Sequence, residues 1–314
     1  MRVAITGATG FVGNALVRSL ARQTTWQLTA LTRRPWPAPA PQVRSLVIGD
    51  LVDARWPADA LADTEGIVHA AAMTSGVPSP PPARLFAVNA AATLALARQA
   101  ASAGVKRFVF LSSIKVNGEE TAPGKPFTVT SAPAPEDAYG QSKLEAERGL
   151  RELANTTGLE VVILRPSLIY GPQVGGNFAH MVNWVARGIP LPLAAVRNRR
   201  TLMALPNLLD LIKTALVSPR AANQTLLAGD ADDVSTPQML EAIADALGRP
   251  LRLFPVPPTL LARAASLLGK REMARKLLGS LQLDIQDTRA RLGWDPPLTT
   301  RQALTETVKT FRAG

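Results

Sequence analysis

A tyrosine and a lysine stand at a spacing that could transfer protons. Tyr139 and Lys143 lie four residues apart in the stretch DAYGQSKLEAE, and the chain has only two tyrosines. If this stretch is helical, the two side chains lie on one face. A nearby ammonium favours the phenolate and lowers the pKa of a tyrosine from its usual value of about 10. Tyr139 would then serve as a proton donor or acceptor near neutral pH.

Two serines are expected to lie close to Tyr139 and Lys143 in the folded protein. Ser112 and Ser113 directly follow the apolar run 108–111, which is predicted to be a strand. In open parallel sheets, ligands bind at the carboxyl ends of the strands. The alternative is that Tyr139 and Lys143 are an ordinary exposed helical pair. The position of the serines at a strand end favours a catalytic role for Tyr139 and Lys143 over an exposed helical pair.

Three glycines near the first residue predict a phosphate-binding turn. Gly7, Gly10 and Gly13 follow the apolar run 3–6 and precede a predicted helix at 12–22. In such a turn the first glycine permits the tight bend, the second lets the backbone meet a pyrophosphate, and the third lets helix and strand pack closely. The helix start supplies amide donors and partial positive charge. A plain strand–helix turn is the alternative, since the spacing is G-x-x-G-x-x-G.

The second predicted strand, 28–31, is followed by arginines rather than by a carboxylate. An acidic residue at this point would bond a ribose 2′-hydroxyl and select NAD, whereas an arginine accommodates the 2′-phosphate of NADP. Here Thr32 is followed by Arg33 and Arg34. We therefore expect NADP(H), with NAD(H) as the alternative. The two arginines could instead be solvated loop residues.

The elements that position these residues alternate between strand and helix. Short apolar runs alternating with helical patterns predict an α/β fold with a doubly wound parallel sheet. The predicted strands are 3–6, 28–31, 46–48, 67–70, 108–111 and 160–164, and the predicted helices are 12–22, 84–103 and 138–156. The proline-rich stretches 33–42 and 75–83 predict surface loops.

The pattern changes after residue 165. Glycine and proline become frequent and helical patterns dominate the last third, so we expect a first domain at 1–165 and a smaller, mostly helical substrate domain at 166–314. Some elements of the second part could return to the first. One helix there has clear boundaries, with Ser235 or Thr236 as its N-cap, Pro237 just inside and Gly248 as its end.

Composition narrows the ligand classes. The formal net charge is +11, but the arginines are mostly scattered, with one dense cluster at 196–200. This favours a phosphate-bearing small molecule over nucleic acid. The chain has no cysteine and only two histidines, so no thiolate chemistry, disulfide or metal site is expected. No apolar leader and no membrane-length apolar run were found, which predicts a cytoplasmic protein without a membrane partner.

Taken together, the motifs resemble the extended short-chain dehydrogenases/reductases, that is, the NAD-dependent epimerase/dehydratase family. The resemblance covers nearly the whole chain and includes nucleotide-sugar epimerases, dehydratases and 4-keto reductases. The motifs are TGATGFVG, GDLVD, HAAA, VNAAAT, LSSIKVNG, YGQSK and RPSLIYGP. The resemblance implies a Rossmann-type sheet and a UDP-sugar as the substrate.

The resemblance also implies a role for each matching residue. Tyr139 would be the catalytic acid/base, Lys143 would hold the nicotinamide ribose, and Ser113 would bond the reacting sugar oxygen. The implied cofactor-binding set, with the two arginines above, is Gly7, Gly10, Phe11, Val12, Gly13, Arg33, Arg34, Asp50, Leu51, Ala70, Ala71, Ala72, Asn89, Ser112, Tyr139, Lys143 and Pro166. The implied substrate-binding set is Ser113, Asn177, Leu191 and Arg200. His69 is expected to be a packed, non-catalytic strand-end residue.

Departures from the family pattern reduce the number of reactions expected of this chain. The family's dehydratases carry Asp-Glu where this chain has Ile114 and Lys115, so 4,6-dehydration is not expected. Leu168 replaces an asparagine that many members use for substrate contact. A 4-keto reductase using NADPH and a 4-epimerase holding NAD remain, and Arg33 and Arg34 favour the reductase.

Three further stretches, 176–193, 195–212 and 267–285, resemble a bacterial reductase subgroup. That subgroup acts on UDP-4-keto-6-deoxy-N-acetylhexosamines for surface polysaccharides such as O-antigen and lipopolysaccharide. A third alternative is a non-catalytic NADP(H)-binding regulatory protein, which the presence of Tyr139, Lys143 and Ser113 disfavours. The family also implies a homodimer through the helices at 84–103 and 138–156.

Overall fold

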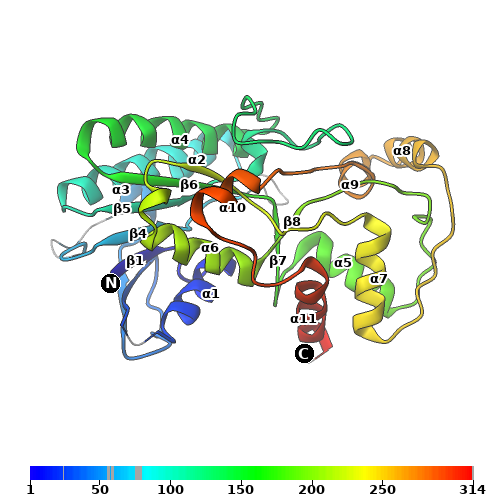
Figure 1. Ribbon diagram of the computed structural model, residues 1–314, viewed down its shortest axis with the longest axis horizontal. Helices are drawn as coiled ribbons and strands as arrows, with labels where there is room; N and C mark the ends of the chain where they lie inside the picture. Colours follow the sequence, from blue (N-terminus) through cyan, green and yellow to red (C-terminus); the bar gives the residue numbers. More distant parts are fainter. Residues whose placement is uncertain (24, 55–56, 58–59, 75–79, 313–314) are drawn as a thin grey trace.

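A seven-stranded parallel sheet organises the amino-terminal part of the chain. The computed structural model describes residues 1–23, 25–54, 57, 60–74 and 80–312. The strands run in the order β3-β2-β1-β4-β5-β6-β9 (Figure 1). Their bounds are β1 Arg2–Thr6, β2 Gln27–Thr32, β3 Val43–Val47, β4 Gly66–His69, β5 Arg107–Leu111, β6 Glu160–Pro166 and β9 Thr225–Ala228. All pairs are parallel, which confirms the predicted fold class.

Helices cover both faces of the sheet because its central strands are apolar on both sides; every residue of β5 is buried. One face packs against α1 (Phe11–Leu20) and α6 (Leu205–Val217). The other packs against α3 (Ala92–Ser102) and α4 (Ala138–Thr157). The chain enters α3 through α2 (Pro82–Phe86) and a π-helical turn, η2 (Ala87–Ala91).

The predicted helix at 84–103 is therefore a continuous helical run with a π turn inside it. In the part of the chain described, α3 and α4 lie side by side on their face of the sheet (Figure 1). The homodimer through these helices stays a prediction. The loop at 33–42 has no regular structure, as expected, whereas residues 75–79 of the second proline-rich loop lie outside the described residues.

The carboxyl-terminal part is mostly helical and packs around its own core. It contains a two-stranded parallel sheet of β7 (Leu168–Tyr170) and β8 (Leu202–Ala204). Its helices are α5 Gly176–Ala186, α7 Thr236–Leu247, α8 Pro258–Leu267, α9 Arg271–Leu278 and α11 Thr300–Arg312. The short 3-10 turns among the described residues are η1 Leu51–Asp53, η3 Ile114–Val116 and η4 Pro219–Ala221. The Tyr170 hydroxyl donates to the carboxylate of Asp230 (2.9 Å) inside this core.

The predicted boundaries of α7 are confirmed. The Ser235 side chain accepts from the backbone of Gln238 in a capping box, Pro237 lies in the first turn, and Gly248 ends the helix with φ +59°. Among the described residues, no helix has the length and apolar character needed to cross a bilayer.

Besides β9 and α6, the helix α10 (Gln286–Leu292) belongs with the sheet of the first half, because it packs on β9 and its Leu292 lies in the core shared by α1 and α6. β9 pairs with β6, and α6 packs on the same face as α1. β9 was not among the predicted strands: its run TLLA is as long as several of them, but it lies after residue 165, where helical patterns dominate.

Candidate active site

Two cavities lie at the carboxyl ends of the strands. The first, of about 430 Å³, is lined by Thr6, Gly7, Thr9, Gly10, Leu31, Thr32, Arg33, Ile48, Gly49, Asp50, Leu51, Ala70, Ala71, Ala72, Met73, Thr74 and Val88. The second, of about 390 Å³, is lined by Thr74, Ser112, Ser113, Ile114, Lys115, Gly118, Glu119, Tyr139, Pro166, Ser167, Leu168, Ile169, Met181, Arg200, Thr236, Met239, Lys276, Leu277 and Leu281. We call them the cofactor cavity and the substrate cavity; Thr74 lines both.

The glycine turn fits a bound pyrophosphate. Gly7 has φ +68°, and a Cβ on it would lie 2.7 Å from the backbone nitrogen of Ala71. A Cβ on Gly13 would lie 2.1 Å from the carbonyl oxygen of Gly7. Gly10 is the N-cap of α1, whose first turn has no carboxylate. Backbone N–H groups at this helix start can therefore approach an anion closely.

Phe11 and Val12 belong to that first turn through their backbone. Neither side chain lines the cofactor cavity. Phe11 instead lines a separate hollow between α1 and α6. A contact of these two residues with a cofactor would therefore come from their backbone N–H groups.

The far end of the cofactor cavity offers an apolar slot with one nearby cation. Leu31, Ile48 and Leu51 supply apolar walls suited to a flat base. Arg33 and Arg34 follow β2 and are both exposed, but only Arg33 lines this cavity.

The Asp50 carboxylate is already engaged in this cavity. It accepts from the backbone N–H of Val52 (3.1 Å) and from the Arg84 guanidinium (2.8 Å). It therefore shapes the end of the slot and holds the start of η1. The predicted adenine contact of Asp50 and Leu51 stays a proposal.

Asn89 acts behind the cavity wall and does not line it. This side chain is buried; it donates to the Met73 carbonyl (2.9 Å) and the Ser142 hydroxyl (3.0 Å), and it accepts from the Met73 N–H (2.8 Å). Its amide therefore ties the loop after β4 to α4. The geometry gives Asn89 a positioning role behind the cavity, and its predicted contact with the cofactor stays a prediction.

The three predicted catalytic residues lie within two neighbouring elements. Ser113 is the N-cap of η3, and its hydroxyl accepts from the N–H of Lys115 (3.2 Å). Tyr139 is in the first turn of α4, and both it and Ser113 line the substrate cavity. Lys143 is one turn further on, with its Nζ donating to the Leu111 carbonyl (2.8 Å).

The electrostatics of this group differ from the prediction. Burial and the charge of Asp137 raise the pKa of Tyr139 to about 12, while a hydrogen bond with Ser113 opposes the shift. Burial lowers the pKa of Lys143 to about 7, although the charge of Glu147 opposes it. The expectation that Lys143 lowers the pKa of Tyr139 is wrong for the protein alone. The Lys143 Nζ points to the Leu111 carbonyl and lies 4.5 Å above the Phe110 ring.

The low pKa of Lys143 predicts a pH-dependent stability. In the unfolded chain this lysine binds its proton up to a pKa of 10.5, but in the folded protein only up to about 7. Because the unfolded state binds more protons in that window, stability rises with pH between about 7 and 10.5. Thermal unfolding should show the wild type gaining stability relative to Lys143→Met from pH 7 to 10. Exposed Lys106→Met is the control, and parallel wild-type and Lys143→Met curves would contradict this.

His69 is packed and satisfied, as expected. Its ring is buried, with Nδ1 bonded to the Thr6 hydroxyl (2.7 Å) and Nε2 to the Thr93 hydroxyl (2.9 Å). Burial, with the charge of Lys143, lowers the pKa of His69 to about 3. It is neutral at physiological pH and lines neither cavity.

The predicted substrate residues separate into three cases. Arg200 lines the substrate cavity and is 8% exposed, and its guanidinium donates to the Gly279 carbonyl (2.9 Å). Asn177 falls in the first turn of α5, and its side chain lies outside the described part of the structure. Leu191 does not reach the substrate cavity; it pairs with Leu253 and lines an apolar groove against α8 and α9.

Several residues of the substrate cavity were not predicted from the sequence. Lys276 and Leu277 reach it from α9, Thr236 and Met239 from α7, and Met181 from α5. No local motif marks these residues, because tertiary packing alone brings their helices to the sheet edge.

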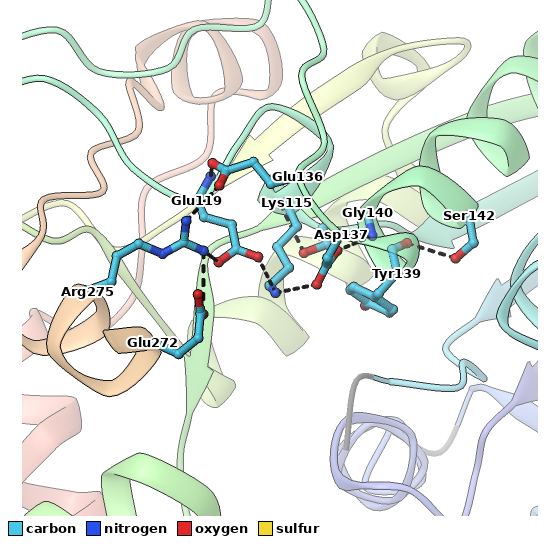
Figure 2. A network of polar contacts seen from close by, with 10 residues as sticks. Lys115, Glu119, Glu136, Asp137, Tyr139, Gly140, Ser142, Glu272 and Arg275 are labelled. Atoms are coloured by element: carbon cyan, nitrogen blue, oxygen red, sulfur yellow. Dashed lines mark hydrogen bonds and ion pairs between the residues drawn. The ribbon is translucent and has the colours of Figure 1, made fainter. Parts of the chain in front are cut away.

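An ionic network surrounds Lys115 at the edge of the substrate cavity. Figure 2 shows its Nζ between the carboxylates of Glu119 (2.6 Å) and Asp137 (2.7 Å). Arg275 of α9 pairs with Glu119 and with Glu136 (2.7 Å). Burial would lower the pKa of Lys115, but its bonds to Asp137 and Glu119 raise it. Glu119 is therefore an engaged carboxylate in this cavity, not a free base.

A buried carboxylate, that of Glu147, holds the Ser112 side chain in place behind the substrate cavity. Glu147 is fully buried and accepts from the Ser112 hydroxyl (2.6 Å) and from Nε of Arg165 (2.9 Å). Arg165 also donates to the Asn117 side chain (2.9 Å). This network fixes Ser112 and with it the backbone that presents Ser113.

A profile of the NAD dependent epimerase/dehydratase family matches residues 3–229. The chain belongs to this family. It is an NAD(P)-dependent enzyme of the extended short-chain dehydrogenase/reductase type, and the glycine turn, apolar slot and α1 start suit a nicotinamide dinucleotide.

Known proteins are similar to this chain along nearly its full length. The chain is 41% identical over 316 residues to a protein of Vibrio cholerae named UDP-glucose 4-epimerase, and the match covers 98% of this chain and 95% of the relative. The structure of UDP-glucose 4-epimerase from Thermotoga maritima with UDP-glucose has a TM-score of 0.79 at 21% identity, covering 100% of this chain and 99% of the other. That of UDP-glucuronic acid 4-epimerase from Bacillus cereus with NAD has a TM-score of 0.80 at 16% identity, with coverage of 100% and 99%.

Proposed function

We propose that this protein is an NADPH-dependent 4-keto reductase acting on a UDP-4-keto-6-deoxy-N-acetylhexosamine, a precursor of surface polysaccharide. The observation that carries the proposal is Arg33. It lines the cofactor cavity directly after β2, where a carboxylate would select NAD. A guanidinium there suits the 2′-phosphate of NADP(H), a cofactor that a reductase consumes.

The state of Tyr139 also supports reduction. Bound NADPH would supply hydride to carbon 4 of the sugar, leaving an alkoxide that needs a proton. A pKa of about 12 keeps the Tyr139 phenol protonated at neutral pH, ready to donate that proton. Ser113, bonded to the phenol, would hold the same oxygen. Lys143 would hold the nicotinamide ribose.

Dehydration is not proposed for this site. Ile114 and Lys115 replace the acidic pair of the dehydratases, and the carboxylate of Glu119 is paired with Lys115 and Arg275. The cations Arg200 and Lys276 line the substrate cavity and would bind the diphosphate of a nucleotide sugar.

A second candidate is a UDP-hexose 4-epimerase that holds NAD tightly. The Vibrio cholerae relative with that name favours it, because that relative matches 98% of this chain. An epimerase would use the same tyrosine in both directions, removing hydride from carbon 4 and returning it to the other face. Both candidates therefore share the site and differ in whether cofactor is consumed.

One experiment separates these candidates. The purified protein is denatured and any released dinucleotide is identified; fresh protein then receives the UDP-4-keto sugar with NADPH or NADH. Stoichiometric loss of NADPH absorbance with consumption of the keto sugar would support the reductase. Tightly held NAD, and interconversion of UDP-glucose and UDP-galactose without net cofactor loss, would replace it with the epimerase.

Arg33→Glu is expected to reverse the cofactor preference. The variant removes charge-assisted bonds to a 2′-phosphate and places a carboxylate beside it, so kcat/KM with NADPH should fall about 10- to 100-fold relative to NADH. Steady-state kinetics with both cofactors measure the ratio. Arg34→Glu is the matched control, because Arg34 follows directly in the chain but does not line the cavity. An equal effect of the two substitutions would contradict a specific role for Arg33.

A further inference from the structure

The helical hairpin of α8 and α9, residues 258–278, lacks a packing partner on its outer side. Neither helix contains a buried residue, although α8 is ten residues long. Helices of this length are marginal in water without tertiary packing. Figure 1 shows the hairpin at the end of the molecule opposite β1. This element would gain stability from an additional surface.

The exposed side of the hairpin carries large apolar side chains. Leu260, Leu267 and Leu268 are 53%, 89% and 72% exposed. With Ala264 they stand at positions i, i+4, i+7 and i+8, which is one face of a helix. Leu267 and Leu268 also lie at the tip, where α8 turns into α9. Two adjacent leucines this exposed are typical of an interaction surface.

Cations surround this apolar tip. Residues 258–278 contain five cations and a single carboxylate, Glu272. Arg263 lies between Leu260 and Leu267 in helical spacing, and Lys270 and Arg271 follow the tip. Within the described residues, none of these three cations forms an ion pair. The surface therefore combines apolar insertion with unpaired positive charge.

The exposed leucines and the unpaired cations together indicate which class of partner this surface would bind. A second copy docked tip to tip would bring the same cations together, which costs free energy. A bilayer with anionic headgroups offers phosphates to the cations and acyl chains to the leucines. We propose that the α8–α9 hairpin docks the protein peripherally on an anionic lipid bilayer. The sequence expectation of no membrane partner rested on spanning segments, which surface docking does not require.

The hairpin is also connected to the substrate cavity. Lys276 and Leu277 of α9 line it, and Arg275 ties α9 to Glu136 and to Glu119, which itself lines the cavity. Docking would bring the wall of this cavity close to the bilayer surface. The proposal rests on the hairpin alone and does not depend on which reaction the site performs.

Vesicle sedimentation tests the docking with the full-length protein. Sucrose-loaded vesicles of phosphatidylglycerol and phosphatidylcholine in equal parts are compared with phosphatidylcholine alone, at low and high salt. We expect binding to the anionic vesicles that weakens with salt. The double substitution Leu267→Glu/Leu268→Glu should lower the apparent affinity about tenfold or more, since it removes apolar insertion and adds repulsion.

Val217→Glu is the matched control, because Val217 is 55% exposed at the end of α6 and should bind as the wild type does. Circular dichroism melting confirms that each variant is folded. Absence of binding to anionic vesicles would overturn the proposal, as would equal binding by the double variant. A concentration-dependent dimer that the double variant abolishes, without vesicle binding, would replace the bilayer with a second copy.

Discussion

Tyr139→Phe is expected to lower turnover about 100- to 10,000-fold, the range typical of losing a positioned general acid or base. The ring remains, so the walls of the substrate cavity keep their shape. What is lost is the hydroxyl that Ser113 bonds and that faces the cavity. Cofactor affinity should change little, because Tyr139 does not line the cofactor cavity.

The measurement pairs turnover with NADPH binding followed by nicotinamide fluorescence. Tyr170→Phe is the control, because Tyr170 is the other tyrosine of the chain and its hydroxyl bonds Asp230 inside the second core. It should lower stability modestly and turnover only severalfold. If Tyr139→Phe kept the wild-type rate, the site would not use this phenol, and the non-catalytic regulatory alternative would gain support.

Glu147→Ala is expected to destabilise the fold by about 3–5 kcal/mol, because it leaves the buried guanidinium of Arg165 without its charged partner. Arg165 is 3% exposed, so water cannot replace the carboxylate. The midpoint of thermal unfolding should fall on the order of 10 °C. Ser112 would lose its acceptor in the same variant, so activity should also fall.

Arg151→Ala provides the comparison. Arg151 pairs with the same carboxylate (2.9 Å) from the surface, where its side chain is 44% exposed, and exposed pairs contribute about 1 kcal/mol or less. Scanning calorimetry of both variants separates a buried charge from a surface one. Equal and small shifts would show that Arg165 finds another partner or water when Glu147 is removed.

The parts of the site that the sequence predicted are those built by neighbours along the chain. The glycine turn lies between one strand and the helix that follows, and the spacing from Tyr139 to Lys143 is one helical turn. Local geometry fixes both. The parallel, doubly wound class of the sheet also follows from the alternation of apolar runs and helices.

The parts that sequence reasoning missed depend on distant residues. Lys276 reaches the substrate cavity from α9, a helix that Arg275 ties to the distant Glu119 and Glu136. The pKa of Tyr139 depends on burial and on Asp137, which no spacing rule reports. Leu191 matched a family position, but here its pairing with Leu253 directs it to another groove.

Because β9 lies at the edge of the sheet but late in the chain, the sheet can be completed only late in synthesis on the ribosome. β6 pairs with β9 along Ile163–Thr225 to Pro166–Ala228, so one edge of β6 has no backbone partners until residue 228 is made. Until then a buried apolar strand is open to pairing with other chains. The growing chain thus passes through a vulnerable interval, which ends only when a segment of its second half completes the sheet of its first.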